Sequence, residues 1–450
     1  MNTSLIILAA GMGTRMNSDL PKVLHPIAGD PMLVHAMAAG ATLDPQHTVV
    51  VAGHGAAEVT AAAHAFDETA TVVVQSEQLG TAHAVDQAKH ALAGFDGTAI
   101  VLYGDTPFVE PHTLEDMLSA AEGADVVVLG FEAADPGRYG RLIMDGASLE
   151  RIVEFKDATK DELAVTLCNS GVIACKSDLL FDLISAVDNT NASGEYYLTD
   201  IIGLARARGL KATAVTCAEA ETLGVNSRAQ LAQAEAAFQA RARVKLMEDG
   251  VTLQAPETVF LARDTFIGRD AYIEPNVFFG TGVTVESGAH IRAFSHLEGC
   301  HISRGSVVGP YARLRPGAEL QENTRVGNFV EIKNATLAEG AKVNHLSYVG
   351  DAFVGSKANI GAGTITCNYD GVMKHHTHIG ANAFIGSNTM LVAPVQIGDG
   401  AMTGSGSVIT SDVEENALAL ARAPQVEKPG MAQKLMDMLR AKKAKQQRGS

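Results

Sequence analysis

The 450-residue sequence has no tryptophan and five scattered cysteines, and only 5% of its residues are aromatic. None of the cysteines forms a CxxC pair, so neither a zinc site nor a disulfide framework is indicated, and reduced thiols of a cytoplasmic protein fit best. No apolar run is long enough to span a membrane. Leu5 to Ala10 is too short, and lacks the basic flank, for a signal peptide.

Basic residues are the minority among the charges, with 35 Lys and Arg against 51 Asp and Glu, and the formal net charge is −16. Such a balance argues against a nucleic-acid surface or an anionic membrane as partner. It leaves room for an anionic small-molecule substrate, because a few basic side chains can dominate the field inside a cleft.

About 225 residues at the N-terminus alternate short β-rich runs with longer, Ala-rich helical stretches. This alternation predicts an α/β domain with a mainly parallel, buried sheet over residues 1–227. A helical pattern follows, and Asp249-Gly250 ends it, so we expect a helical linker over residues 228–250. The expected strands are Ser4–Ala10, Thr48–Ala52, Thr71–Val74, Ala99–Leu102 and Asp125–Phe131.

The C-terminal half has a period of six. From Ile267 to Ile409, 24 positions follow this spacing with three one-residue slips and one interruption; 22 of them are apolar and two, Thr366 and Thr403, are threonine. A period of six fits neither an α-helix nor an isolated alternating strand, and it predicts a parallel β-helix over residues 251–450. The interruption, CNYDGVMKHHTH, is expected to form a protruding loop, and the basic, helix-prone tail after Pro429 to be a solvated or disordered end.

Gly11-Met-Gly-Thr-Arg-Met16 follows the first expected strand, and Pro21-Lys22 comes shortly after it. Glycines after a strand let backbone N–H groups approach a phosphate, and Arg15 and Lys22 supply two cations. Taken alone, the glycines fit a plain tight turn equally well. In the same way, Asp105 before Pro107 by itself suits a turn better than a site.

Several further motifs, in this order along the chain, favour a phosphate-binding loop over a plain turn: LxAGxGxRM with PK, QSEQLGTAHA, LYGDTPF, GRYGRL, GEYYLTD and GVNSR. The chain resembles the sugar nucleotidyltransferases and, over nearly its whole length, the bifunctional N-acetylglucosamine-1-phosphate uridyltransferase/glucosamine-1-phosphate N-acetyltransferase family. The resemblance implies a Rossmann-like α/β domain, a left-handed β-helix, a homotrimer and a cytoplasmic enzyme. Its substrates would be UTP, glucosamine 1-phosphate, N-acetylglucosamine 1-phosphate and acetyl-CoA.

By this resemblance the N-terminal domain uses Mg²⁺, held by Asp105 and Asn226, and transfers a uridylyl group without a protein nucleophile. Arg15 and Lys22 would be catalytic, and Gln75, Gly80 and Thr81 would read the uracil. GEYYLTD, including Tyr197, would line the same pocket. The full set implied for nucleotide and sugar comprises Leu8, Ala9, Ala10, Gly11, Lys22, Gln75, Gly80, Thr81, Tyr103, Gly104, Asp105, Gly140, Glu154, Asn169 and Asn226.

In the β-helix the resemblance implies that His345 is the general base of acetyl transfer, oriented by Glu331. A histidine drawn blindly from 15 would be structural far more often than catalytic. The cluster His375, His376 and His378 suits a solvated loop better than a metal site. The residues implied for the sugar phosphate are Arg315, Lys333, Tyr348 and Asn359, and those implied for acetyl-CoA are Ala362, Asn368, Tyr369, Ser387, Ser405 and Arg422.

Position 405 is Ser where the family often has Ala, which matters only if the side chain contacts the coenzyme.

Two alternatives stay open at this point. One is a nucleotidyltransferase with a regulatory, non-catalytic β-helix, although such chains typically lack NHLSYVGD and CNYDG. The other is a non-catalytic, translation-factor-like subunit, which would not be expected to retain Arg15, Lys22, Asp105 and His345.

Overall fold

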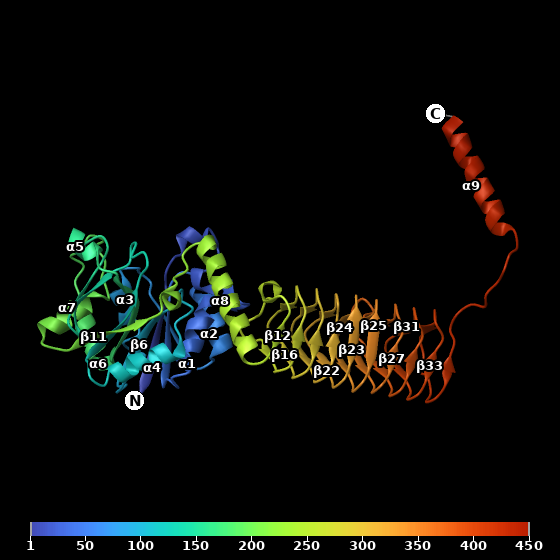
Figure 1. The fold of residues 1–450 in the computed structure, drawn as a ribbon, viewed down its shortest axis with the longest axis horizontal. Helices are drawn as coiled ribbons and strands as arrows, with labels where there is room; N and C mark the ends of the chain where they lie inside the picture. The colour runs from blue at the N-terminus through green and yellow to red at the C-terminus, as the bar shows by residue number, and fades with distance from the viewer. Residues whose placement is uncertain (1, 449–450) are drawn as a thin grey trace. The chain divides into compact units, whose positions relative to one another are not determined.

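The computed structural model describes residues 2–448 and divides the chain into two compact units. The first comprises residues up to Lys245 together with Phe260–Asp264. The second comprises Leu246–Val259 and the chain from Thr265 onward. Each unit has its own architecture, an α/β fold in the first and stacked coils of short strands in the second (Figure 1).

The first unit is built on a sheet with the strand order β11-β7-β10-β6-β1-β4-β5. All pairs along this order are parallel except the two that β10 makes, so the predicted mainly parallel sheet is confirmed. The five strands expected from the sequence are present: β1 (Thr3–Ala9), β4 (His47–Ala52), β5 (Thr71–Val74), β6 (Thr98–Tyr103) and β7 (Val126–Glu132).

Four strands had no clear signal in the sequence. β10 (Leu167–Lys176) lies antiparallel between β6 and β7, and its register with β7 shifts between Asn169 and Ile173. The hairpin of β8 (Arg141–Asp145) and β9 (Ser148–Val153) pairs with β10, and β11 (Ala212–Cys217) closes one edge. The Asn-Ser-Gly that causes the irregularity in β10 also breaks its apolar pattern.

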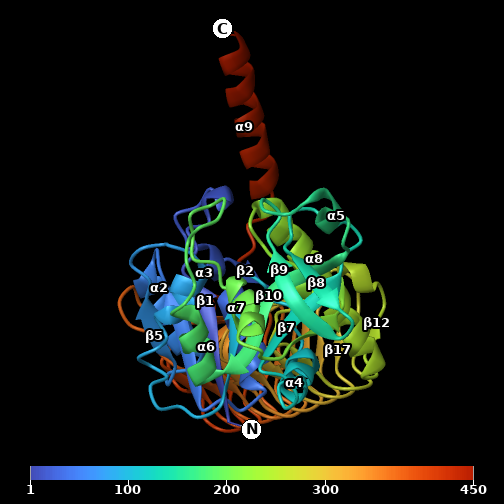
Figure 2. The ribbon, with the colours of Figure 1, turned by 90° about the vertical axis from the view of Figure 1, so that its left-hand side faces the viewer.

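Both faces of this sheet are buried. In β1, Leu5, Ile7 and Ala9 join one hydrophobic cluster while Ile6 and Leu8 join another, as the alternation of a strand requires. Helices cover both clusters (Figure 2). They are α1 (Met32–Ala41), α2 (Ala56–Phe66) and α4 (Pro111–Ala120) on the first, α3 (Thr81–Asp86), α6 (Ser177–Ile184) and α7 (Asp200–Ala207) on the second, and a separate short α5 (Lys160–Leu163).

The helix expected after residue 227 is α8 (Arg228–Glu248), and it belongs to the first unit as far as Lys245. Leu231 and Phe238 pack in a small cluster around Ile27 and Met32. Gln239 is 2% exposed, and its amide donates to the Leu261 carbonyl oxygen at 2.7 Å and accepts from the Leu261 N–H at 2.9 Å. The helix is therefore anchored to the first unit by packing and by buried hydrogen bonds.

The second unit is a parallel β-helix, as the period of six predicts. All 24 periodic positions point into its core, and none is more than 4% exposed. Strands pair in parallel with equivalent residues one coil on, for example Ile273 with Ile291 and, at a slip, Val285 with Ile302. The strands run from β12 (Thr252–Leu253) to β35 (Leu418–Ala419), and those near the candidate site are β21 (Arg313–Leu314), β23 (Arg325–Asn328), β24 (Glu331–Leu337), β25 (Lys342–His345), β26 (Tyr348–Val354) and β27 (Asn359–Ile360).

The interruption of the period forms an extra loop on one coil. Val354 pairs directly with Ile379, so one coil contains several more residues than its neighbours, and Tyr369, Val372 and Met373 in the surplus are exposed. The tail forms α9 (Met431–Arg448), and the described side chains of its residues 431–447 are exposed. Among the described residues, no helix is long and apolar enough to cross a membrane.

Candidate active sites

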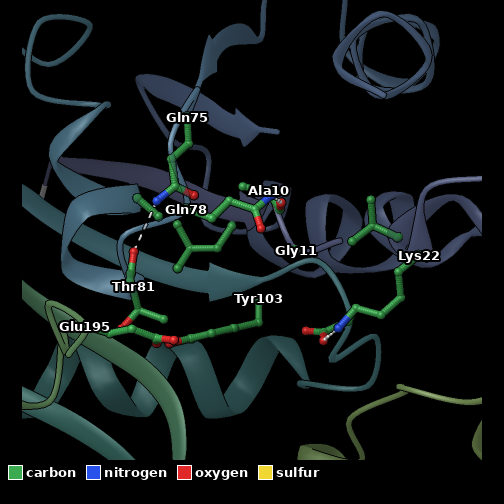
Figure 3. Close-up of a pocket in the computed structure, with 13 residues that line it drawn as sticks. Ala10, Gly11, Lys22, Gln75, Gln78, Thr81, Tyr103 and Glu195 are labelled. Carbon is green, nitrogen blue, oxygen red and sulfur yellow. Dashed lines mark hydrogen bonds and ion pairs between the residues drawn. The ribbon is translucent and has the colours of Figure 1, made fainter. Parts of the chain in front are cut away.

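A pocket of about 310 Å³ opens in the first unit beside the carboxyl ends of β1 and β6 (Figure 3). Ligands of open α/β sheets bind at this edge, because loops there leave a crevice between neighbouring strands. Its lining contains nine of the residues implied by the sequence: Leu8, Ala10, Gly11, Lys22, Gln75, Gly80, Thr81, Tyr103 and Asp105. Val23, Gln78, Ala84 and Glu195 complete the lining.

The loop after β1 needs glycine at position 13. Gly13 has φ of 61°, and a Cβ there would lie 2.6 Å from Lys22 Cβ. The close approach turns the chain so that Lys22 enters the pocket, while Arg15 stays exposed and does not line it. Gly104 donates its N–H to the Leu8 carbonyl oxygen at 2.9 Å, which ties the ends of β1 and β6 together.

Lys22 brings two of the implied ligands to one point. Its ammonium is ion-paired with Asp105, and it donates to Asn226 Oδ1 at 3.0 Å. The Lys22 and Asp105 side chains are 12% and 20% exposed. A carboxylate and an amide oxygen that converge on one cation form a donor set that fits a hard divalent ion.

Gln75 and Thr81 sit on the other side of the pocket. Gln75 is 5% exposed, and its Nε2 donates to the Gly80 carbonyl oxygen at 3.2 Å and contacts His83 Nδ1 at 3.0 Å. Thr81 Oγ1 accepts the Leu198 N–H at 2.9 Å. Gly80 is required here, because a Cβ at this position would lie 2.5 Å from the Tyr196 carbonyl oxygen.

Gly140, Glu154 and Asn169 form a neighbouring group that does not line the pocket itself. The Asn169 N–H donates to the Gly140 carbonyl oxygen at 2.9 Å, and a Cβ on Gly140 would lie 3.5 Å from Glu154 Oε1. Burial raises the pKa of Glu154, and the Thr199 hydroxyl, which donates to it at 3.2 Å, only partly offsets this. Burial also raises the pKa of Tyr103, which keeps its phenol neutral.

Two polar lining residues were not named individually from the sequence, and the expected GEYYLTD segment contributes one of them, Glu195, and not Tyr197. Gln78 Nε2 donates to the Ala10 carbonyl oxygen at 2.8 Å, and Glu195 reaches the pocket from the segment before α7. Both lie inside motifs already singled out, QSEQLGTAHA and GEYYLTD. The motifs were the available signal, but which of their side chains enter the pocket depends on the turn geometry.

In the β-helix, His345 lies at the end of β25 and is exposed. It borders a recess of about 220 Å³ that Arg292, Arg325 and Asn328 also line. His345 Nδ1 is 2.9 Å from Asn328 Oδ1. Because an amide oxygen only accepts, Nδ1 carries the proton in this contact and Nε2 keeps its lone pair. This is the tautomer that a general base needs.

The expectation that Glu331 orients His345 is wrong in this structure. Glu331 Oε1 accepts from Arg315 at 2.8 Å, and its Oε2 is 3.7 Å from Arg313. Glu331 occurs in β24 and His345 in β25, which belong to different sheets. Arg313 of the neighbouring β21, and Arg315 just after it, therefore reach the carboxylate first.

Cations gather around Lys333. Its pKa is lowered by the adjacent Lys374 and, further away, by Arg315. Burial tends to raise the pKa of nearby Asp351, but hydrogen bonds from Asn334 and Asn368 outweigh it and the net pKa is lowered. Arg315 is also paired with Glu331, and Asp351 acts to raise the pKa of Lys333, so carboxylates balance part of this charge. The excess of positive charge suits an anion such as a phosphate. Lys374 was missed because it lies in the loop that interrupts the period.

Tyr348 and Asn359 are the remaining residues implied for the sugar phosphate, and Tyr369 is one of those implied for acetyl-CoA. Asn368 Nδ2 is 3.4 Å from Tyr348 Oη, which places these two side chains together. Asn359 is half-buried in β27 and pairs with Lys342. Tyr369 is 60% exposed in the extra loop.

Three of the six residues implied for acetyl-CoA share a column with His345. His345, Ala362, Ser387 and Ser405 occupy equivalent positions on successive coils. Each coil is tied to the one before it by a backbone hydrogen bond: Gly363 N–H to the His345 carbonyl oxygen at 3.2 Å, Asn388 N–H to that of Ala362 at 2.7 Å, and Gly406 N–H to that of Ser387 at 2.8 Å. Arg422 Nη1 donates to the Ser405 carbonyl oxygen at 2.7 Å. With about 4.8 Å between neighbouring strands, three steps span roughly 14 Å.

The histidines of the extra loop do not gather around a common point. His375 Nε2 contacts Asp370 Oδ2 at 2.7 Å, whereas the His378 ring stacks on Phe353 with centroids 5.0 Å apart. Within residues 2–448 they belong to no group of three or more His, Cys, Asp or Glu that could hold a metal ion.

Comparison with known proteins finds a family model that matches part of each unit. The family model "MobA-like NTP transferase domain" matches residues 5–170, and "Bacterial transferase hexapeptide (six repeats)" matches residues 376–411. Among curated relatives, "Bifunctional protein GlmU" from Roseobacter denitrificans is 71% identical over 100% of both chains. The proteins of the same name from Ruegeria sp. and Ruegeria pomeroyi are 70% and 71% identical, again over 100% of both chains.

Proposed function

Since the chain belongs to the family of bifunctional GlmU proteins, we propose that it makes UDP-N-acetylglucosamine in two steps. The β-helix acetylates glucosamine 1-phosphate with acetyl-CoA. The α/β domain then transfers UMP from UTP to N-acetylglucosamine 1-phosphate and releases pyrophosphate. The observation that carries this proposal is full-length identity of about 70% combined with an intact constellation of side chains in each unit.

For uridylyl transfer, the chain supplies positioning and charge. Gln75, Gly80 and Thr81 hold the uracil, while the loop from Leu8 to Gly11 cradles the phosphates with Lys22 and Arg15. Arg15 is exposed at the loop, so we expect it to swing onto the triphosphate when this binds. A phosphate oxygen of the sugar phosphate attacks the α-phosphorus of UTP, and pyrophosphate leaves. The work of the site is alignment and neutralisation of charge.

The metal proposed for this site is Mg²⁺. Support comes from the convergence of the Asp105 and Asn226 oxygens on a single cationic atom, the ammonium of Lys22. When bound, the ion would draw negative charge from the transferring phosphoryl group. Lys22 then has to release Asp105, and its ammonium becomes available to the phosphates.

For acetyl transfer, His345 is the proposed base. The amine of glucosamine 1-phosphate attacks the thioester carbonyl, His345 Nε2 takes the amine proton, and the thiolate of coenzyme A leaves and is protonated. Asn328 holds the imidazole in the required tautomer through the 2.9 Å contact. Arg315, Lys333 and Lys374 are grouped where they would bind the sugar phosphate.

The assembly and the location are also proposals. A coil of three flat faces offers surfaces that pack around a threefold axis, and we propose a homotrimer in the cytoplasm with acetyl-transfer sites between subunits. The proposed domains are residues 1–227 for uridylyl transfer, 228–250 as helical linker and 251–450 for acetyl transfer with the tail. Light scattering at micromolar concentration tests the trimer, and a monomer with full acetyltransferase activity would refute it.

The decisive test incubates the full chain with glucosamine 1-phosphate, acetyl-CoA, UTP and Mg²⁺ and identifies every product by mass spectrometry. We expect free coenzyme A, pyrophosphate and UDP-N-acetylglucosamine. Omission of acetyl-CoA should prevent formation of that nucleotide sugar unless N-acetylglucosamine 1-phosphate is supplied instead. A chain with a regulatory β-helix would use N-acetylglucosamine 1-phosphate but would release no coenzyme A from glucosamine 1-phosphate.

A further inference from the structure

The amide of Gln75 has two chemically different ends, and what it presents to a nucleobase depends on which end faces the pocket. Its Nε2 lies 3.2 Å from the Gly80 carbonyl oxygen and 3.0 Å from His83 Nδ1 (Figure 3 shows the nitrogen directed towards the segment that carries Thr81). A carbonyl oxygen only accepts, so the nitrogen of Gln75 must face Gly80. Rotation of the amide would bring two oxygens together.

The second hydrogen of this amide needs an acceptor, and His83 provides one only in a particular tautomer. When Nδ1 accepts from Gln75, Nε2 carries the proton. Nε2 is 3.3 Å from Gln87 Nε2, which also donates to the His83 carbonyl oxygen at 2.9 Å. A neutral ring accepts from only one of the two amides. The Gln75 contact is the shorter one at 3.0 Å, and the half-buried Gln87 can turn its second hydrogen to water.

Gln75 is 5% exposed, so its second hydrogen has little access to water, and His83 Nδ1 at 3.0 Å is the acceptor beside it. His83 itself is half-buried and also lines a second cavity of about 260 Å³, bounded by Asp86, Lys89 and Tyr196. Both hydrogens of the Gln75 amide are engaged, and only its oxygen is left for the nucleotide pocket.

We infer that His83 is a positioning residue that sets the preference for uracil over cytosine by holding the Gln75 oxygen towards the base. This rests on the proposed uridylyl transfer. Uracil carries an N–H at position 3, which that oxygen accepts, whereas cytosine carries a bare acceptor nitrogen there. Two facing acceptors repel, so a fixed Gln75 rejects CTP. Without His83 one anchor is lost, and the amide gains freedom to turn and donate to cytosine.

The experiment measures kcat/KM of the full-length protein for UTP and CTP with N-acetylglucosamine 1-phosphate. His83→Phe keeps a flat ring without an acceptor, and His83→Leu serves as a second variant. Both should lower the ratio of UTP to CTP about ten-fold, the typical worth of a lost site hydrogen bond. A ratio of two rates is independent of how much protein is folded, so a merely structural role of His83 would not move it.

Three controls sharpen the result. His83→Asn places an amide oxygen near the position of Nδ1 and should restore the wild-type ratio. Gln87→Met removes the other neighbour of the ring and should leave the ratio unchanged. 5-Methyl-UTP has the same hydrogen-bonding edge as UTP, so the ratio between these two should not respond to His83→Phe.

The outcomes separate cleanly. Wild-type uridylyl transfer combined with an unchanged UTP to CTP ratio in both His83→Phe and His83→Leu would overturn the inference alone. A wild-type protein that forms no nucleotide sugar from UTP would overturn the proposed function and the inference with it. A lowered ratio that His83→Asn restores would establish His83 as the residue that orients Gln75.

Discussion

Replacement of His345 and of its partner Asn328 should reduce acetyl transfer to two different extents. His345→Ala removes the proton acceptor, which typically costs about 10²–10⁴ in rate. Asn328→Ala leaves the imidazole but removes one neutral hydrogen bond of 2.9 Å, worth about 0.5–1.5 kcal/mol, or roughly 2- to 13-fold. Since His345 is exposed, its replacement should change the free energy of unfolding by no more than about 0.5 kcal/mol.

The assay follows coenzyme A release and nucleotide-sugar formation separately in each variant, together with the melting temperature. Uridylyl transfer from N-acetylglucosamine 1-phosphate should stay near the wild-type rate in both, because the two constellations occupy different units. Arg15→Ala serves as the reciprocal control and should reduce uridylyl transfer alone. A stable His345→Ala protein that acetylates at the full rate would refute the assigned base. Equal losses of acetyl transfer in His345→Ala and Asn328→Ala would refute the assignment of His345 as base and Asn328 as the residue that only orients it.

Three further predictions concern the metal, a buried carboxyl group and the core. EDTA or Asp105→Ala should abolish uridylyl transfer and spare acetyl transfer, and unchanged nucleotide-sugar formation in EDTA would disprove the metal assignment. Burial raises the pKa of Glu154 in the folded protein above its value in the unfolded chain. Ionised Glu154 therefore lowers the free energy of unfolding, fully so above the folded pKa, and this cost is absent below the unfolded pKa, where the group is protonated in both states. Glu154→Gln should therefore raise the melting temperature at pH 8 but not at pH 3, while nucleotide-sugar formation falls. Ile332→Ala, at a fully buried core position, should lower the free energy of unfolding in urea by about 2–5 kcal/mol, and a loss no larger than that of an exposed Arg313→Ala control would contradict the core assignment.

The β-helix could be predicted closely because its signal is local and repeated. Every coil places one branched residue inward at a spacing of six, so each position supports the next and a slip is visible at once. The two threonines in the series follow the same rule. Thr366 Oγ1 accepts from the Gly350 N–H at 2.8 Å, and Thr403 Oγ1 accepts from the Gly386 N–H at 3.0 Å, so their buried hydroxyls are satisfied.

The α/β unit was predictable where strands are apolar and parallel, and less so elsewhere. β1, β4, β6 and β7 appear as apolar runs because both their faces are buried. The edge strand β5 is also a branched run, although its residues are exposed or half-buried. β10 was not visible, since its Asn-Ser-Gly breaks the run and its antiparallel position between β6 and β7 depends on partners distant in sequence. Local composition carries no information about such pairing.

Which side chains meet was decided by the tertiary structure. The sequence by itself determined that Lys22, Asp105 and His345 follow strands or occupy a coil, and the motifs indicated their chemistry. Only the fold brought Lys22 to Asp105, 83 positions away, and assigned Asn328 rather than Glu331 to His345. The physical reason is that a repeat specifies which way a residue points, whereas the partner of a side chain depends on how neighbouring coils and strands are stacked in register, and a one-residue slip changes it.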